Sequence, residues 1–135
     1  YYVNSYKRFW DKHRFDIFDT SRKSTMYVKD IVLSWNRNNK DVLQRIYDDY
    51  FHKTFGSFCF LFNPNLKLNR KARYARLKEI TDIFMDDISC DGIEINHPIF
   101  KCMKKKNYRT IYVRIVLHIW KHKFDWIWHK LLTKE

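Results

Sequence analysis

Three histidines and an aspartate near the C-terminus have a spacing that could bind a metal ion. They fall at positions i, i+4, i+7 and i+11, which lie within about 60° of one another on a helix: His118, His122, Asp125 and His129. Zinc accepts imidazole and carboxylate ligands, but structural zinc sites usually draw on paired ligands from separate segments. We therefore interpret the four residues as the polar face of an amphipathic helix, and we expect no metal or other cofactor.

The cysteines are a weaker candidate for metal binding. The spacing of His97 and Cys102 is similar to the end of a zinc knuckle, but the paired cysteine that should precede them is missing. Buried thiols are therefore the better interpretation of Cys90 and Cys102. Three cysteines in all are too few, and odd in number, for a disulfide scaffold.

The sequence lacks the usual motifs of enzyme active sites. Four acidic residues could hold a hard cation, namely Asp86, Asp87, Asp91 and Glu94. Their spacing is not that of an EF-hand, and we expect a solvated or lysine-paired acidic segment instead. With two glycines in the chain and neither a glycine-rich phosphate loop nor a nucleophile elbow, the sequence predicts a protein that is not an enzyme.

Positive charge is the strongest chemical signal. The chain has 27 lysines and arginines against 15 aspartates and glutamates, a net charge of +12. Ten of the basic residues but two of the acidic residues lie within residues 98–135. We select eight cations from two clusters as candidate RNA contacts: Arg70, Lys71, Arg73, Arg76, Lys104, Lys105, Lys106 and Arg109.

The charges of the first cluster run against the polarity of the helix that should carry them. Residues 64–78 contain six basic residues and no acid, whereas residues 79–94 contain six acids and no basic residue. On a helix over 70–88 this order opposes the macrodipole, at about 0.3–1 kcal/mol per charge. We expect compensation from outside the helix, and a phosphate polyanion at its N-terminus would supply it.

These features favour a nucleic-acid or other polyanion partner over a surface whose charge only keeps the protein soluble. Tyr74 near Arg73, and Tyr108 beside Arg109, are placed to stack on unpaired nucleobases. No aromatic ribonucleoprotein motif, GxxG loop or zinc-finger spacing is present. We therefore expect binding through backbone charge and shape more than through base readout.

A mainly α-helical fold would position these residues. Apolar spacing predicts helices at residues 26–36, 40–54, 70–88, 98–106 and 109–132. Asn39, Asn69 and either Asn96 or His97 are the predicted N-caps, and Gly56 is predicted to end the second helix. Residues 57–62 are an apolar run that fits a short strand or a buried connection. Residues 109–119 also alternate as a strand would, but no turn residue follows before Leu132, so we choose a helix.

The predicted organisation is an extended aromatic and basic arm over 1–25, followed by one helical domain over 26–135. No apolar run is long enough for a membrane-spanning helix. The AT-codon residues Ile, Asn, Lys, Phe, Tyr and Met supply 62 positions, while Gly, Pro and Ala appear twice each. Five tryptophans in so AT-rich a composition would fit a code in which UGA encodes tryptophan, as in many mitochondria. An AT-rich parasite, virus or bacterium with the standard code is the alternative.

Charge and composition together predict a non-catalytic, RNA-binding structural component of a ribonucleoprotein, foremost a mitochondrial ribosomal protein. Its expected partners are rRNA or another polyanion and the neighbouring proteins of a large complex. One alternative is a peripheral, non-membrane subunit of a mitochondrial assembly such as a respiratory complex. Another is a host-interaction protein of an AT-rich virus or parasite. If the protein is not mitochondrial, we expect it in the cytoplasm.

Overall fold

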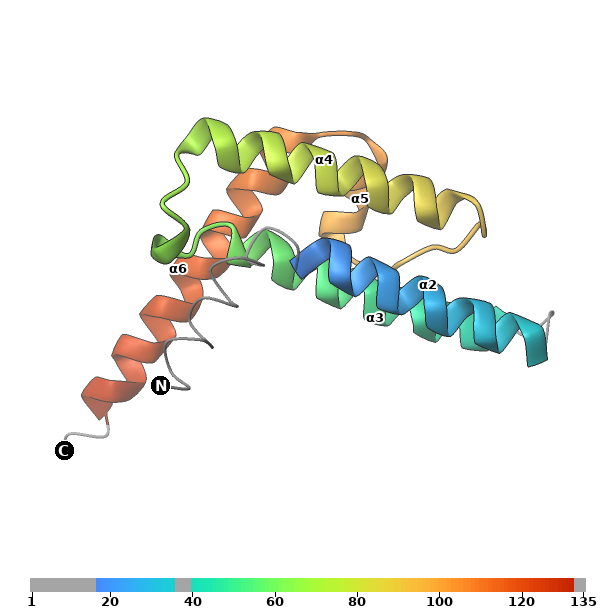
Figure 1. Cartoon of the computed structure of the whole chain (residues 1–135). Helices are drawn as coiled ribbons and strands as arrows, with labels where there is room; N and C mark the ends of the chain where they lie inside the picture. Colours follow the sequence, from blue (N-terminus) through green and yellow to red (C-terminus); the bar gives the residue numbers. More distant parts are fainter. Residues whose placement is uncertain (1–16, 36–39, 133–135) are drawn as a thin grey trace, which may run out of the picture.

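Helices account for almost all of the structure that can be described. The computed structural model describes residues 17–35 and 40–132, with side chains to residue 123, and contains no strand within these ranges. The elements are α2 (Ile17–Trp35), α3 (Lys40–Phe60), a 3₁₀ turn η1 (Pro64–Leu66), α4 (Arg70–Ser89), α5 (Pro98–Lys104) and α6 (Tyr108–Leu132). This confirms the predicted small, mainly α-helical domain (Figure 1).

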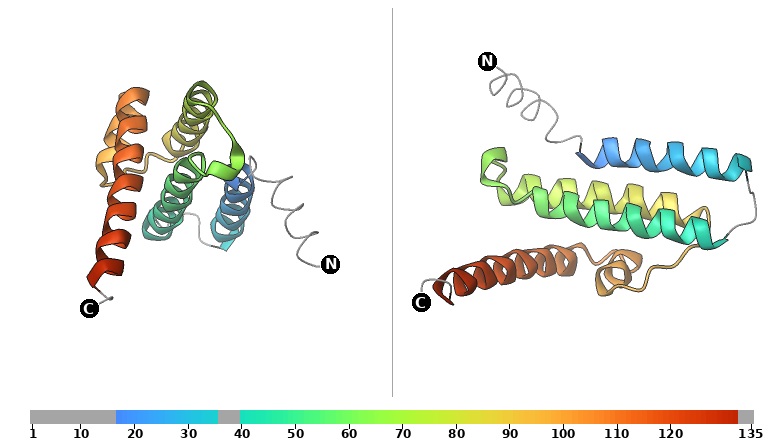
Figure 2. Two further views of the ribbon diagram at one scale, coloured as in Figure 1. Left: turned by 90° about the vertical axis from the view of Figure 1, so that its left-hand side faces the viewer. Right: turned by 90° about the horizontal axis from the view of Figure 1, so that it is seen from below.

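Helix α3 connects α2 to the other helices, because it contacts α2, α4 and α6. Helices α2 and α3 form an antiparallel pair, and α4 runs beside them (Figure 2). Helix α6 contacts α3, α4 and α5 with its N-terminal half. Its C-terminal half extends beyond the other helices in Figure 1.

Aromatic rings fill the space between the helices. Tyr50 of α3 lies between Phe18 of α2 and Phe84 of α4, with ring centroids 6.0 and 4.8 Å away. All three side chains are almost completely buried. Helices α5 and α6 add Phe100 and Ile111, which are equally buried. Burying each such side chain contributes about 1.5–3 kcal/mol, so these rings are a main part of the shared core, whereas Tyr27, Trp35 and Trp120 are exposed.

The predicted beginnings of two helices are confirmed. The Asn69 side chain accepts a hydrogen bond from the Ala72 N–H at 2.8 Å, and α4 begins at Arg70. His97, one of the two predicted caps, accepts from the Ile99 N–H through Nδ1 at 3.1 Å, with Pro98 in the first turn of α5. Each cap satisfies one of the amides that a helix N-terminus leaves without an internal partner. The helical interpretation of 109–132 is also confirmed by α6.

The predicted arm is wrong for residues 17–25, which belong to α2. Phe18 and Thr25 are two turns apart on one helical face, and both are buried against the domain. Apolar residues mixed with charges therefore mark an amphipathic helix here rather than an extended segment. Residues 1–16 of the predicted arm, and the predicted cap Asn39, lie outside the described residues.

The alternative of a short strand near 57–62 is also wrong, as is a helix end at Gly56. Helix α3 continues through Gly56 to Phe60. Ser57, Phe58 and Leu61 are buried and follow Thr54 at helical spacing. A glycine inside a helix costs about 1 kcal/mol, less than burying Phe58 contributes. Tertiary packing therefore outweighs the local preference.

No helix among the described residues combines the length and the apolar content needed to cross a bilayer, which agrees with the prediction from the sequence.

Candidate nucleic-acid interface

A cationic groove lies between the N-terminal halves of α4 and α6. Its volume is about 670 Å³. The walls are formed by Arg70, Lys71 and Tyr74 from α4 and by Arg109, Tyr112 and Val113 from α6. The structure thus brings one residue of the second predicted basic cluster next to two residues of the first.

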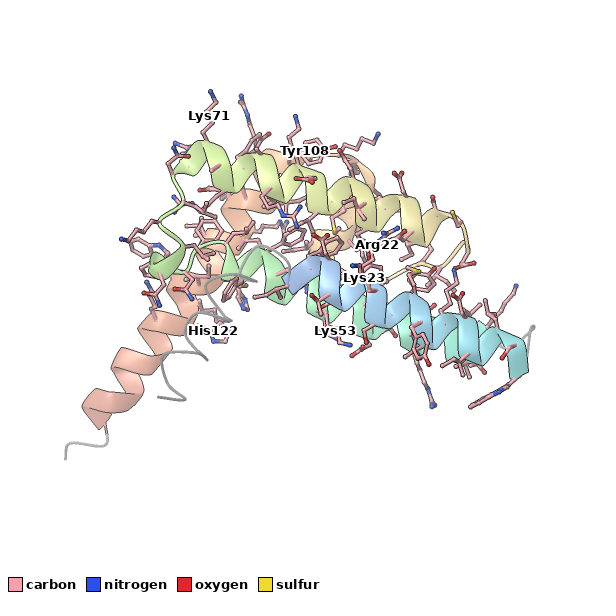
Figure 3. All side chains as sticks on the ribbon, in the orientation of Figure 1. Arg22, Lys23, Lys53, Lys71, Tyr108 and His122 are labelled. Atoms are coloured by element: carbon pink, nitrogen blue, oxygen red, sulfur yellow. The ribbon has the colours of Figure 1, made fainter. Side chains whose placement is uncertain are left out.

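Helical spacing explains which side chains face the groove. On α4, Arg70 and Tyr74 are one turn apart; on α6, Arg109 is one turn from Tyr112 and Val113. The two helices contact each other at this level, and the Tyr74 and Tyr112 ring centroids are 6.2 Å apart. In Figure 3, Lys71 points outward from the first turns of α4, on the side of the molecule opposite to Lys23 and Lys53.

Arg73, a predicted RNA contact, supports the groove from within. Its Nε donates to the Tyr112 hydroxyl at 3.1 Å, and its Nη1 donates to the Leu68 carbonyl at 3.1 Å. The guanidinium also lies 5.0 Å from the centroid of the Phe62 ring, at a distance typical of a cation–π contact. These contacts fix the position of the Tyr112 ring and connect α4 to α6.

Arg76, another predicted contact, is paired within the protein. Its guanidinium lies 3.3 Å from the Asp19 carboxylate of α2 and 3.1 Å from Glu79. Only 14% of the Arg76 side chain is exposed. The structure therefore gives Arg76 a role in holding α2 against α4.

Several carboxylates of the acidic half of the reversed charge pattern are paired within the protein. Asp87 pairs with Arg22, Asp91 pairs with Lys29, and Glu94 pairs with Lys104. The lysine pairs of Asp91 and Glu94 agree with the expected solvated or lysine-paired acidic segment, whereas Asp87 pairs with an arginine. Hydrogen bonds from Lys29 and Tyr47 hold the pKa of Asp91 below its ordinary value, although burial acts in the opposite direction.

The basic half of the pattern keeps a surplus of charge at the groove. Within the described ranges, no carboxylate lies at ion-pair distance from Arg70, Lys71 or Arg109. All three side chains are exposed. Arg70 and Lys71 also lie in the first turn of α4, where the helix dipole already favours an anion. The positive charge at the N-terminus of α4 therefore still calls for the compensating anion outside the helix that the sequence predicts.

The lysine run 104–106 has a structural role at the end of α5, away from the lining of the groove. The Lys106 N–H bonds the Met103 carbonyl at 3.1 Å, and the Asn107 N–H bonds the Cys102 carbonyl at 3.0 Å. This is the hydrogen-bond pattern of a Schellman motif, with Lys106 in the left-handed conformation at φ 54°. Cations in such a last turn interact favourably with the helix dipole. Lys105 and Lys106 are exposed and remain predicted contacts.

Two residues that line the groove, Tyr112 and Val113, were missed among the candidates selected from the sequence. Lys78 was also missed; it lies beside the groove, with Nζ 6.0 Å from the Tyr74 ring and 5.2 Å from the Tyr108 ring. A spacing rule would have found all three, because Lys71, Tyr74 and Lys78 follow one another at helical spacing, and Tyr112 and Val113 lie one turn from Arg109.

Tyr108 has a different role from the stacking that its position in the sequence suggests. Its hydroxyl donates to the Asp82 carboxylate at 2.5 Å, and this hydrogen bond raises the pKa of Tyr108 to about 12. The ring lies beneath Lys78. Tyr108 therefore connects the first turn of α6 to α4 at one end of the groove.

The candidate metal ligands are only partly described. The rings of His118 and His122 are adjacent, with centroids 4.4 Å apart, whereas the side chains of Asp125 and His129 lie outside the described residues. Elsewhere in the described structure, no three histidine, cysteine or acidic side chains converge as metal ligands.

The expectation of buried thiols is wrong for Cys90. This side chain is exposed in the turn that follows α4. Cys102 is half-buried in α5, and both thiols are free. Burial raises the pKa of the third thiol, Cys59, because a thiolate is poorly solvated inside the protein.

The fold and the groove define a small helical domain with a cationic and aromatic surface site. Comparison of the chain with protein-family models, with curated proteins and with solved structures found no match. A function must therefore be inferred from the geometry and charge of the groove.

Proposed function

We propose that the protein binds RNA through the groove between α4 and α6, as a non-catalytic structural component of a ribonucleoprotein. The organelle-type composition makes a mitochondrial ribosome the first choice, with rRNA as the ligand. The observation that carries the proposal is the asymmetric pairing of charge along α4. The carboxylates of Asp87 in the last turn of α4 and of Asp91 just beyond it are paired inside the protein, whereas Arg70 and Lys71 in the first turn are exposed.

Three cations around one concave site suit a phosphate backbone. Each phosphate neutralised by a lysine or arginine releases counterions, so affinity falls as salt rises. Arg109 comes from a different helix than Arg70 and Lys71, which spreads the positive charge over both walls of the groove. Successive phosphates of one strand can therefore contact both walls.

The test is the salt dependence of RNA binding by the full chain. We expect the variant Arg70→Gln/Lys71→Gln/Arg109→Gln to bind RNA at least tenfold more weakly at about 50 mM salt. Its slope of log affinity against log salt should be smaller by roughly 2, since three phosphate contacts are lost.

A matched control removes the same charge elsewhere. Lys23→Gln/Arg45→Gln/Arg114→Gln also replaces one lysine and two arginines, all exposed and none lining the groove. Equal losses in both triple variants would contradict a specific role of the groove. Millimolar or weaker binding of the unaltered chain at about 50 mM salt would contradict RNA binding altogether.

Two further measurements address the assembly. The protein should sediment with ribosomal RNA from mitochondrial extracts, and it should not follow respiratory complexes. Its affinity for vesicles containing anionic lipid should be lower than for RNA at the same salt concentration. The opposite result in both experiments would favour the peripheral subunit of a membrane assembly.

A further inference from the structure

We infer that the groove receives single-stranded RNA, with an unpaired nucleobase against the rings of Tyr74 and Tyr112 and the flanking phosphates on Arg70, Lys71 and Arg109. This inference rests on the proposed function and names the form of RNA that the site recognises.

The lining of the groove points to an unpaired strand. Tyr74, Tyr112 and Val113 lie among the three cations, and 54% of Val113 is exposed. Phosphates alone would need no apolar surface between the charges. In a duplex the faces of the nucleobases are covered by stacking, whereas an unpaired nucleobase presents its face to aromatic side chains.

The two tyrosine rings contact each other in a tilted arrangement, and both line the groove. Their planes are inclined at 59° with centroids 6.2 Å apart, so they do not stack on each other. Tyr112 is held from behind by Phe62, at a centroid distance of 5.1 Å, and by the hydrogen bond from Arg73. Its ring is therefore positioned before a ligand arrives, which lowers the entropic cost of binding.

The dimensions of the groove also suit a nucleotide. A volume of about 670 Å³ lies within the range of roughly 300–1,000 Å³ seen for small-molecule pockets. The α6 face that lines the groove then continues with Leu117 and Trp120, one and two turns beyond Val113, with 62% and 72% exposed. A strand leaving the groove along α6 would thus meet further apolar surface for its next nucleobases.

The experiment compares RNAs of equal length that differ in pairing. We expect a single-stranded 12-nucleotide RNA to bind the full chain at least tenfold more tightly than a 12-base-pair duplex at the same salt concentration. A 2-aminopurine placed in the single strand should lose fluorescence on binding, because stacking on an aromatic ring quenches it.

Variants of Tyr74 test the site. Tyr74→Leu should lower the affinity for the single strand about tenfold and leave the affinity for inorganic polyphosphate unchanged. Tyr74→Phe, which keeps the ring, should restore binding. The control Tyr27→Leu removes an equally large ring, 69% exposed on α2, and should change nothing. Circular dichroism checks that each variant is folded.

The outcomes separate this inference from the function on which it rests. If duplex and single strand bind equally, or if Tyr74→Leu acts no differently from Tyr27→Leu, stacking in the groove is refuted. RNA binding through the groove would still stand if the triple variant of Arg70, Lys71 and Arg109 lost affinity. If no RNA binds, both proposals fail.

Discussion

Arg22 of α2 donates two hydrogen bonds to the carboxylate of Asp87 in α4, although 65 residues separate them. The Nε–Oδ2 distance is 2.7 Å and the Nη2–Oδ1 distance is 2.9 Å. Tyr50 of α3 donates to the same carboxylate at 2.7 Å. Burial, and then the hydrogen bond to Asp87, raise the pKa of Tyr50 far above its ordinary value. One aspartate therefore joins three helices.

Replacing this aspartate should destabilise the fold. Asp87→Ala leaves the hydroxyl of Tyr50 and the guanidinium of Arg22 without their acceptor, and only 11% of the Asp87 side chain is exposed. We expect the free energy of unfolding to fall by about 2 kcal/mol, as measured by urea denaturation. The neighbouring Asp86 is exposed, so Asp86→Ala should change it by less than about 0.5 kcal/mol. Similar losses in both variants would contradict the role of Asp87.

The cap of α5 should make stability depend on pH. The pKa of His97 is lowered, first by burial and then by the nearby charges of His52, Arg114 and His118. The neutral ring also accepts the Ile99 N–H, which a protonated ring cannot do. Because the folded pKa lies below the ordinary value of 6.5, the folded protein resists protonation. Stability should be complete above pH 6.5 and should decrease as the pH falls through the folded pKa.

The variant His97→Asn isolates this effect. Asparagine is a good N-cap that does not titrate in this range. It loses the ring contacts of His97 with Phe51 and Phe55, so stability at pH 7 should fall by about 0.5–1.5 kcal/mol. Its melting temperature should fall less between pH 7 and pH 5 than that of the unaltered chain. Part of the decrease should remain, because the pKa of His118 is also lowered by burial and by His122 and Lys121. An unchanged pH profile would exclude the capping role.

Lys106 should be replaceable by glycine with a gain in stability. It occupies the left-handed position of the Schellman motif at φ 54°, a conformation that costs a residue with a side chain about 1 kcal/mol. Lys106→Gly should raise the free energy of unfolding by roughly 0.5–1 kcal/mol. Lys105 has φ −82°, a conformation that residues with a side chain adopt readily. Lys105→Gly should therefore lower the free energy of unfolding by a similar amount. Thermal denaturation of the two variants is the measurement. If both variants changed stability in the same direction, the assignment of Lys106 to the left-handed position would be contradicted.

Arg73 should matter for stability more than for the salt dependence of binding. Arg73→Met keeps much of the side-chain length but loses the hydrogen bonds to Tyr112 and Leu68. We expect the free energy of unfolding to fall by about 1–2 kcal/mol. The slope of log affinity for RNA against log salt should stay within about half a unit of that of the unaltered chain. A slope reduced by a full unit without a change in stability would show that Arg73 contacts phosphate directly.

Local signals in the sequence were enough for much of the helical framework. Asn69 and Pro98 mark the beginnings of α4 and α5 because caps depend on neighbouring residues alone. The apolar stripe from Leu77 to Ile88 is likewise a property of one segment. Long-range burial decided the rest: Phe18 extends α2 into the predicted arm, and Phe58 carries α3 past Gly56.

The charges show the same contrast between what the sequence determines and what the tertiary structure decides. The sequence by itself determined that the chain is basic, that α4 carries its charges in reverse order, and that tyrosines accompany the cations. Only the tertiary structure decided that Arg76 is paired while Arg70 and Lys71 are left exposed, and that Arg109 joins them across a groove. The physical reason is that ion pairing depends on distance in space, and Asp19 and Arg76 become neighbours only when α2 and α4 pack in the folded domain.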